Sequence, residues 1–153
     1  MIVGDDELDA AQPRGLWRRC SLHEYRKPQP AWELLLDLDA LGRSEGENWV
    51  WGGAVCLGPH YRRALLSLSR GGADAHVVRE FDLVERRFVD GGFELAEAKS
   101  ELAWADIDTV YVATDFGPGT LTDSGYPRIV KAWKRGTPLS AARTMFEGRQ
   151  TDM

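Results

Sequence analysis

The sequence is divided into short apolar runs by turn-forming residues, and this punctuation restricts the possible folds more than any other feature. Sixteen glycines and seven prolines supply most of the breaks. The runs are 16–20, 32–38, 49–57, 64–69, 76–83, 87–89, 101–104, 109–116, 128–133 and 143–146. Only residues 40–45 and 139–142 favour a helix, and both segments are too short to organise a domain. Short strands without intervening helices predict an antiparallel all-β sandwich, barrel or propeller.

An internal repeat favours the propeller among these three. Residues 63–68 align with residues 109–114, and residues 77–81 align with residues 129–133 after an insertion. The order of strands and the hydrophobic positions match better than the residue identities. Each unit holds four strand candidates, and a four-stranded unit of about 40–50 residues is typical of a propeller blade. We therefore predict an all-β chain of antiparallel, four-stranded propeller blades.

The alignment also sets the expected domain organisation. The expected parts are a disordered N-terminal tail at 1–12, a partial β-propeller at 13–148, and a C-terminal tail at 149–153. Within the propeller we expect part of a blade at 16–38 and full blades at 49–93 and 100–147. Propellers have four to eight blades, and neighbouring blades cover each other's faces. We therefore expect that the natural chain continues beyond Met153, or that several copies assemble, and that the chain alone is poorly soluble.

The composition argues against two classes of partner. The formal net charge is -5 and the sequence pI is about 5.2, whereas proteins that bind nucleic acid usually carry a basic patch. No apolar run approaches the ~20 residues of a membrane-spanning helix. Residues 1–10 are acidic and contain no apolar core of a signal peptide. We expect a cytoplasmic protein that binds neither nucleic acid nor a membrane.

The cysteines and histidines do not form a metal-binding pattern. Cys20 and Cys56 are far apart and belong to no Cys-x-x-Cys motif, so we interpret them as free thiols, although the sequence alone leaves a disulfide open. His23, His60 and His76 have no second histidine or cysteine at the spacing of zinc ligands. We predict no metal site and no cofactor.

Several local strings resemble catalytic motifs but lack their context. Asp115-Phe116-Gly117 matches the metal-binding tripeptide of kinases, yet the phosphate loop and the catalytic loop are missing. Ser124 lacks the first glycine of a nucleophile elbow. The acidic residues at positions 5, 6, 7 and 9 lie in the polar N-terminal segment, where we expect them to be solvated. We predict no catalytic residue in this chain.

The tryptophans permit two interpretations. The six residues are Trp17, Trp32, Trp49, Trp51, Trp104 and Trp133, and most lie in expected strands. Large rings on a propeller could stack on sugars or peptides, or they could fill the space between blades. We favour packing between blades, because aromatic side chains bury much apolar surface in such positions.

A set of strings between residues 13 and 148 shows a family resemblance. The strings are Pro13-Arg14-Gly15-Leu16-Trp17-Arg18-Arg19, Glu24-Tyr25-Arg26, residues 32–41, residues 45–51, residues 67–74, residues 79–82, Thr114-Asp115-Phe116-Gly117 and residues 124–128. Taken together, they resemble the first propeller region of bacterial proteins of the prolyl oligopeptidase family, serine peptidase family S9.

This resemblance implies a fold and an activity for the intact protein. In the family, a seven-bladed propeller caps an α/β-hydrolase domain, and the propeller restricts entry of large folded substrates to a shared cavity. A Ser-Asp-His triad in the hydrolase domain cleaves short peptides, typically after proline. In such a triad the serine attacks the carbonyl, the histidine transfers its proton and the aspartate orients the histidine.

The chain departs from the family pattern in two respects. It contains no hydrolase domain, so no triad residue can be assigned to any position here. In the family, an aromatic residue near the strand at 99–104 helps to line the substrate pocket, but the strand Lys99-Ser100-Glu101-Leu102-Ala103-Trp104 does not begin with one. We therefore assign no substrate-binding residue.

We expect this chain to be a propeller segment of a prolyl oligopeptidase-like serine peptidase, encoded by a truncated reading frame and inactive alone. Its expected role is to control peptide access to the hydrolase domain. The expected partners are the peptide substrate, that domain and the remaining blades. The alternative is a non-catalytic binding module in which several copies complete a ring.

Overall fold

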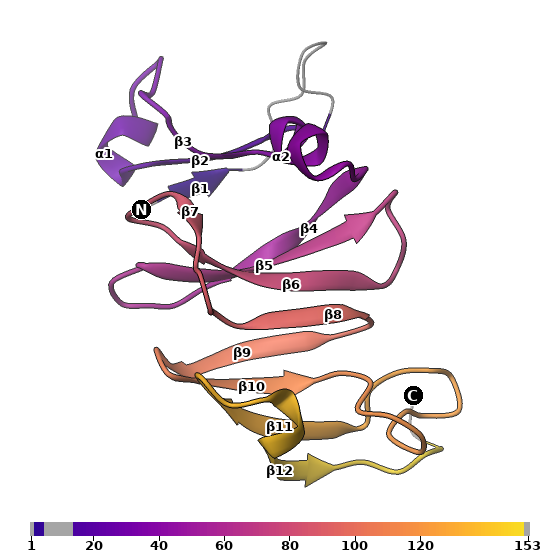
Figure 1. Cartoon of the computed structure of the whole chain (residues 1–153). Helices are drawn as coiled ribbons and strands as arrows, with labels where there is room; N and C mark the ends of the chain where they lie inside the picture. The colour runs from indigo at the N-terminus through magenta and orange to yellow at the C-terminus, as the bar shows by residue number, and fades with distance from the viewer. Residues whose placement is uncertain (1, 5–13, 152–153) are drawn as a thin grey trace.

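The computed structural model describes residues 2–4 and 14–151, and it consists almost entirely of strands in three antiparallel sheets (Figure 1). The first sheet has the order β1-β2-β3. Its strands are β1 (Ile2–Gly4), β2 (Leu16–Cys20) and β3 (Glu33–Asp37). The short helix α1 (Leu22–Tyr25) lies between β2 and β3, and α2 (Leu38–Glu45) leads from β3 to the next sheet.

Helix α2 is bounded by capping residues. The Asp37 carboxylate accepts a hydrogen bond from the Ala40 amide at 3.1 Å, which satisfies one of the free N–H groups of the first turn. Gly46 ends the helix with φ of 68°, a conformation that glycine adopts without strain.

The central sheet is formed by β4 (Trp49–Cys56), β5 (Arg63–Arg70), β6 (His76–Asp82), β7 (Arg87–Phe88) and β8 (Glu94–Ala98). The order is β4-β5-β6, and β7 and β8 both pair with β6. This sheet therefore has five strands, and β8 lies beyond residue 93, where we had placed the end of the blade.

The last sheet is a four-stranded meander in the order β9-β10-β11-β12. Its strands are β9 (Glu101–Asp106), β10 (Thr109–Ala113), β11 (Ile129–Lys134) and β12 (Arg143–Glu147), and a 3₁₀ turn (Leu139–Ala141) precedes β12. The predicted antiparallel all-β fold is confirmed, and each of the expected runs contains a strand. The three sheets stand side by side and do not close into a ring (Figure 1).

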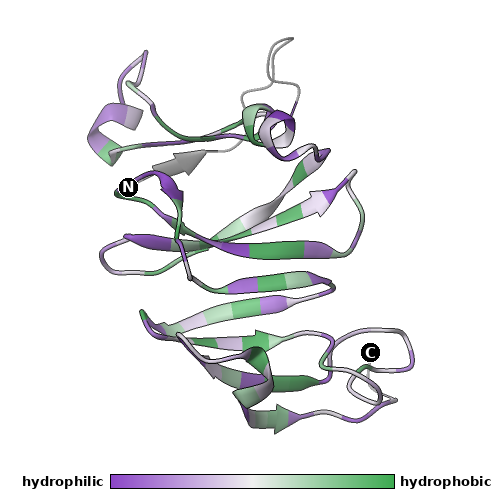
Figure 2. Ribbon diagram, in the orientation of Figure 1, coloured by the Kyte–Doolittle hydropathy of each residue, from purple (hydrophilic) through white to green (hydrophobic). Residues whose placement is uncertain are grey.

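The central sheet is buried on both faces because the other two sheets pack against it. Ala64 and Leu66 of β5 contact Trp17 and Leu35 of the first sheet in one cluster. Leu65, between them in the sequence, joins a second cluster with residues of the last sheet. Successive side chains of a strand point to opposite faces. The consecutive apolar residues at the start of β5 are therefore explained by a sheet covered on each side, and Figure 2 shows hydrophobic residues in the strands of the middle layer.

The internal repeat is visible in three dimensions. Strands β5 and β10 are the second strands of their sheets, and β6 and β11 are the third strands. Val110 and Val112, which align with Ala64 and Leu66, also face the preceding sheet. Tyr111 aligns with Leu65, but it is 40% exposed, because no described sheet covers the far face of the last one.

The tryptophans pack mostly between sheets, as we had favoured. Trp17 contacts Trp51 and Phe81, with ring centroids 5.2 and 5.3 Å apart. Trp133 contacts Phe93 at 5.0 Å. Trp104 joins the same cluster as Trp133, and its indole N–H donates to the Val55 carbonyl at 2.9 Å. These rings fill the space between neighbouring sheets.

Candidate functional site at the loop end of the sheets

The strings that resemble catalytic motifs are structural turns. The Asp115 carboxylate accepts a hydrogen bond from the Gly117 amide at 2.9 Å, and Gly117 has φ of 117°. This local bond turns the chain after β10. Ser124 is exposed in a tight turn between Thr122 and Gly125. The acidic residues at positions 5, 6, 7 and 9 lie outside the described residues.

The candidate metal ligands are dispersed. His23 lies on α1, His60 lies in the turn after β4, and His76 begins β6. Across residues 14–151 no group of three or more histidine, cysteine or acidic side chains is arranged to hold a metal ion. Cys20 and Cys56 are both free thiols, and burial raises the pKa of Cys56. Nor is any helix in the described part long and apolar enough to span a membrane.

Three connections from two sheets meet at one end of the molecule, to the right in Figure 1. They are the turn between β5 and β6, the link between β8 and β9, and the long loop between β10 and β11. A cavity of about 290 Å³ lies among them. Its lining residues are Asp74, His76, Lys99, Ser100, Glu101, Tyr126 and Pro127. This volume is near the lower limit of small-molecule sites, about 300 Å³.

Hydrogen bonds connect residues that line the cavity to residues of the loop and strand next to it. The Ser100 hydroxyl is buried and lies 2.7 Å from the hydroxyl of Thr114. The amide of Tyr126 donates to the Thr122 hydroxyl at 3.1 Å, and the Thr122 amide donates to the Tyr126 carbonyl at 2.7 Å. These bonds hold Ser100, which follows Lys99 in the sequence, and the backbone of the turn that carries Tyr126.

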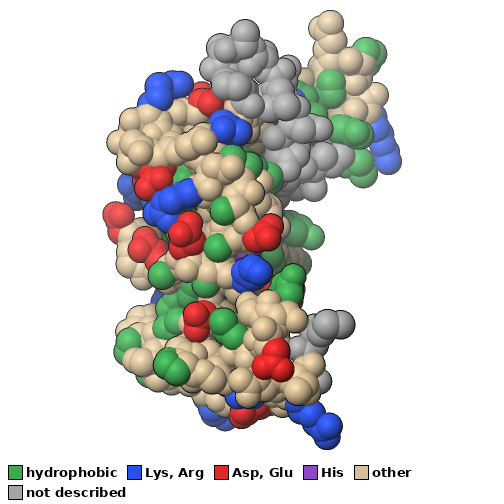
Figure 3. Space-filling view, turned by 90° about the vertical axis from the view of Figure 1, so that its right-hand side faces the viewer, with side chains coloured by type: hydrophobic (Ala, Val, Ile, Leu, Met, Phe, Trp, Pro, Cys, Tyr) green, Lys and Arg blue, Asp and Glu red, His purple; other side chains and the backbone are tan. Residues whose placement is uncertain are grey.

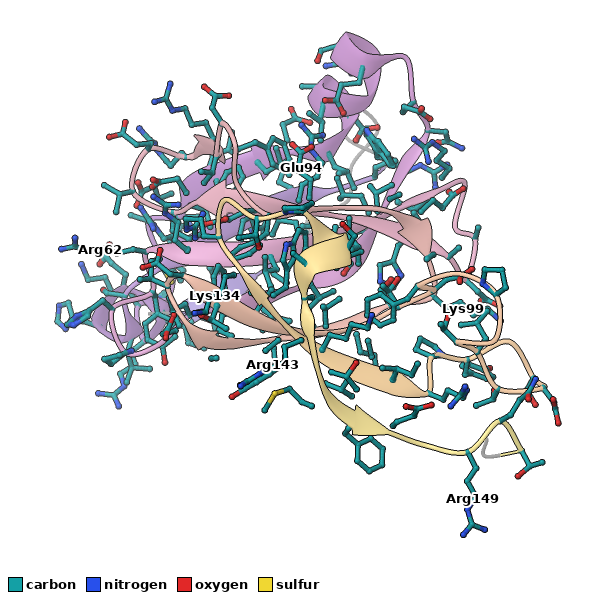
Figure 4. The ribbon with its side chains drawn as sticks, turned by 60° about the horizontal axis from the view of Figure 1, so that its bottom comes forward. Arg62, Glu94, Lys99, Lys134, Arg143 and Arg149 are labelled. Atoms are coloured by element: carbon teal, nitrogen blue, oxygen red, sulfur yellow. The ribbon has the colours of Figure 1, made fainter. Side chains whose placement is uncertain are left out.

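The cavity contains one lysine whose charge is not neutralised. The Lys99 ammonium lies 4.7 Å from the centre of the Tyr126 ring, a cation–π contact. Within the described part of the chain, Lys99 forms no ion pair at 4.0 Å or less, although Asp74 and Glu101 line the same cavity. Figure 4 shows Lys99 beside the loop of the last sheet.

The two sheets that form the cavity are also joined at their opposite end. Both oxygens of the Glu80 carboxylate in β6 accept hydrogen bonds from Arg135, which follows β11, at 2.8 and 2.9 Å. Arg63 and the Phe93 amide also donate to this carboxylate, at 2.8 and 2.9 Å. Burial alone would raise the pKa of Glu80, but the bonds from Arg135, Phe93 and Arg63 outweigh it and lower the pKa.

Comparison with known proteins identifies the family of these stacked sheets. Residues 8–153 match the family model described as the N-terminal β-propeller domain of prolyl oligopeptidase. The chain belongs to this family. The resemblance that the sequence strings indicated is therefore confirmed, and the three sheets are blades of a prolyl oligopeptidase propeller.

Similar proteins agree with this assignment. The chain is 43% identical over 145 residues to the uncharacterized peptidase y4nA of Sinorhizobium fredii, and this match covers 95% of this chain and 20% of that protein. It is 35% identical over 148 residues to the uncharacterized peptidase RP174 of Rickettsia prowazekii, covering 92% of this chain and 20% of that protein. A post-proline cleaving enzyme from Rickettsia typhi has a similar structure, with a TM-score of 0.86 and 34% identity, over 94% of this chain and 22% of that one.

The chain thus spans about a fifth of the length of the peptidases that it matches. The sequence patterns predicted no substrate-binding residue in the cavity at the loop end. Its charged and aromatic residues come from three connections that are distant in sequence, such as Asp74, Lys99 and Tyr126. No local pattern brings them together, because their proximity depends on how the central and last sheets pack.

Proposed function

We propose that this chain is a propeller segment that controls the access of peptides to the catalytic domain of a prolyl oligopeptidase-like serine peptidase. The observation that carries the proposal is the match of residues 8–153 to the propeller domain of that family. Three stacked sheets with interlocked side chains support it, because a rigid wall of blades excludes folded proteins and admits only extended peptides. We place the protein in the cytoplasm.

In this proposal the chemistry belongs to an α/β-hydrolase domain that is not among these 153 residues. The triad serine of that domain attacks the peptide carbonyl while its histidine accepts and returns the proton. The propeller contributes by selecting the size of the substrate and by excluding bulk water from the shared cavity. The chain alone is therefore inactive.

The absence of catalysis is tested with a serine-directed fluorophosphonate probe on the purified 153-residue chain. We expect no labelling under conditions that label a known serine peptidase completely. Labelling that is lost on denaturation would show an activated serine in this chain and would overturn this part of the proposal.

The gating role is tested in the continuous peptidase that carries this segment. Arg135→Ala removes the ion pair between the two sheets, and we expect it to increase cleavage of a long peptide relative to a short one. Arg70→Ala is the matched control, because Arg70 binds Glu47 and Glu97 at the surface, at 3.0 and 3.2 Å. An unchanged preference for short peptides in Arg135→Ala, with the protein still folded, would contradict gating by the propeller wall.

A second candidate function is a non-catalytic binding module assembled from several copies. The specific observation in its favour is the uncovered face of the last sheet, where Tyr111, Met145 and Phe146 are 40%, 49% and 64% exposed. A single defined multimer in solution would favour this candidate over the peptidase segment, and light scattering measures that state directly.

A further inference from the structure

The cavity at the loop end combines an available positive charge with an aromatic wall. Lys99 is half-buried, and its ammonium is held over the Tyr126 ring instead of a carboxylate. A lysine oriented in this way keeps N–H donors for a ligand, because a cation–π contact occupies only one side of the ammonium group.

The wall that orients Lys99 is preorganised. Tyr126 lies in a short turn that is closed by two hydrogen bonds to Thr122 and by the bridge between Leu121 and Pro127. The start of the same loop is fixed where the Thr120 hydroxyl accepts from the Phe116 amide at 3.0 Å. A loop that is ordered before binding loses less conformational entropy when a ligand arrives.

The other charged groups around the cavity limit the kind of ligand. Asp74 and Glu101 are exposed carboxylates in the same lining, so the cavity repels a ligand that carries many negative charges. His76, half-buried at the start of β6, can donate a further hydrogen bond. Figure 3 looks toward this end, and acidic and basic side chains are interspersed on it without a large patch of one sign. The surroundings therefore suit a single carboxylate better than a polyanion such as nucleic acid.

We propose that this cavity binds the carboxylate of an acidic residue in a short peptide, with Lys99 as the residue that recognises the charge. The Tyr126 ring and Pro127 provide an apolar wall for the methylene groups of that residue. The inference deepens the proposed function, since it names the peptide class that the propeller prefers, and it rests on that function for its biological meaning.

The direct test uses the 153-residue chain and two peptides that differ by one charge. These are N-acetyl-Ala-Ala-Glu-amide and N-acetyl-Ala-Ala-Gln-amide, and binding is followed by NMR shifts of the Ser100 and Tyr126 amides. We expect the glutamate peptide to bind about tenfold more tightly, the effect of one charge-assisted hydrogen bond. Equal affinities, or no shift with either peptide, would overturn the inference.

Variants of the chain assign the effect to Lys99. Lys99→Met should abolish the difference between the two peptides, and Lys99→Arg should keep most of it. Lys134→Met is the matched control, because Lys134 is an exposed lysine at the far end of β11 (Figure 4). Discrimination that survives Lys99→Met would also overturn the inference. Because binding is measured without hydrolysis, its failure leaves the gating proposal to be judged by its own experiment.

Discussion

Arg135 binds both carboxylate oxygens of Glu80, and this pair joins the last sheet to the central one at 2.8 and 2.9 Å. The side chain of Glu80 is fully buried, whereas that of Arg135 is 24% exposed. The same guanidinium donates to the Ile107 carbonyl at 2.6 Å, in the turn between β9 and β10. Arg135 therefore links the two sheets through charged hydrogen bonds, in addition to the apolar cluster that lies between them. The contacts between the central and last sheets are tested by Glu80→Gln, by the pH profile of stability and by Trp104→Phe. The face of the last sheet that no described sheet covers is tested by Phe146→Ser.

Replacing Glu80 by glutamine should lower the free energy of unfolding by about 3 kcal/mol, because removing one partner of a buried ion pair leaves the other charges uncompensated. Glu97→Gln is the matched control, since Glu97 and Arg70 are 41% and 44% exposed, and a change below about 0.5 kcal/mol is expected there. Urea denaturation measures both values. Similar losses in the two variants would contradict the importance of the Glu80 cluster.

Stability should also depend on pH through Glu80. Because hydrogen bonds lower its pKa in the folded state from the ordinary value of 4.5, the ionised form stabilises the fold well above pH 4.5. This contribution should be lost progressively as the pH falls below 4.5 toward the folded-state pKa. The measured quantity is the difference in unfolding free energy between the wild type and Glu80→Gln. A difference that stays constant from pH 7 to pH 3 would show that Glu80 does not titrate in this way.

Trp104→Phe should destabilise the chain by about 1 kcal/mol, because it keeps an aromatic ring but removes the hydrogen bond to the Val55 carbonyl in β4. Trp32→Phe serves as the comparison. Trp32 packs on Tyr25 at 6.1 Å and lies under Arg18 at 4.7 Å, so its loss should be smaller. Thermal unfolding of the two variants distinguishes them, and an equal loss would argue against the contact between sheets.

Phe146→Ser should reduce self-association of the isolated chain, because Phe146 is 64% exposed on the uncovered last sheet. Tyr25→Ser is the control, since Tyr25 is 53% exposed on α1, far from that sheet. Light scattering after size-exclusion chromatography, over a range of concentrations, reports the mass. Unchanged self-association in Phe146→Ser would indicate that another surface is responsible.

Much of the fold follows from local patterns. The short apolar runs between turn residues and the repeat between β5 and β10 were sufficient to predict stacked antiparallel sheets. Strand β8 was missed because Glu94-Leu95-Ala96-Glu97-Ala98 contains only one large apolar residue and is rich in residues that disfavour strands. It pairs with β6 through backbone hydrogen bonds, and its Leu95 fills the cluster between sheets. The segment forms a strand because of these tertiary contacts, although its local propensity disfavours one.

The ion pair between the sheets and the candidate site at the loop end were both beyond prediction from sequence. Glu80 appears in the sequence as an ordinary acidic residue in a strand, and Arg135 appears as a surface charge in a turn 55 residues later. Nothing local distinguishes this pair from the many acidic and basic residues that remain at the surface. The same holds for Lys99 and Tyr126, whose contact depends on the conformation of the loop after β10.

The sequence by itself determined that this chain forms short antiparallel strands in repeated sheets, because turn residues and side-chain alternation along a strand are local properties of the chain. The tertiary structure decided which charges meet and where the cavity lies. Those contacts join side chains from different sheets, and their distances depend on how the sheets stack. Burial then gives the contacts their effect, since an ion pair such as Glu80 and Arg135 interacts strongly only where water is excluded.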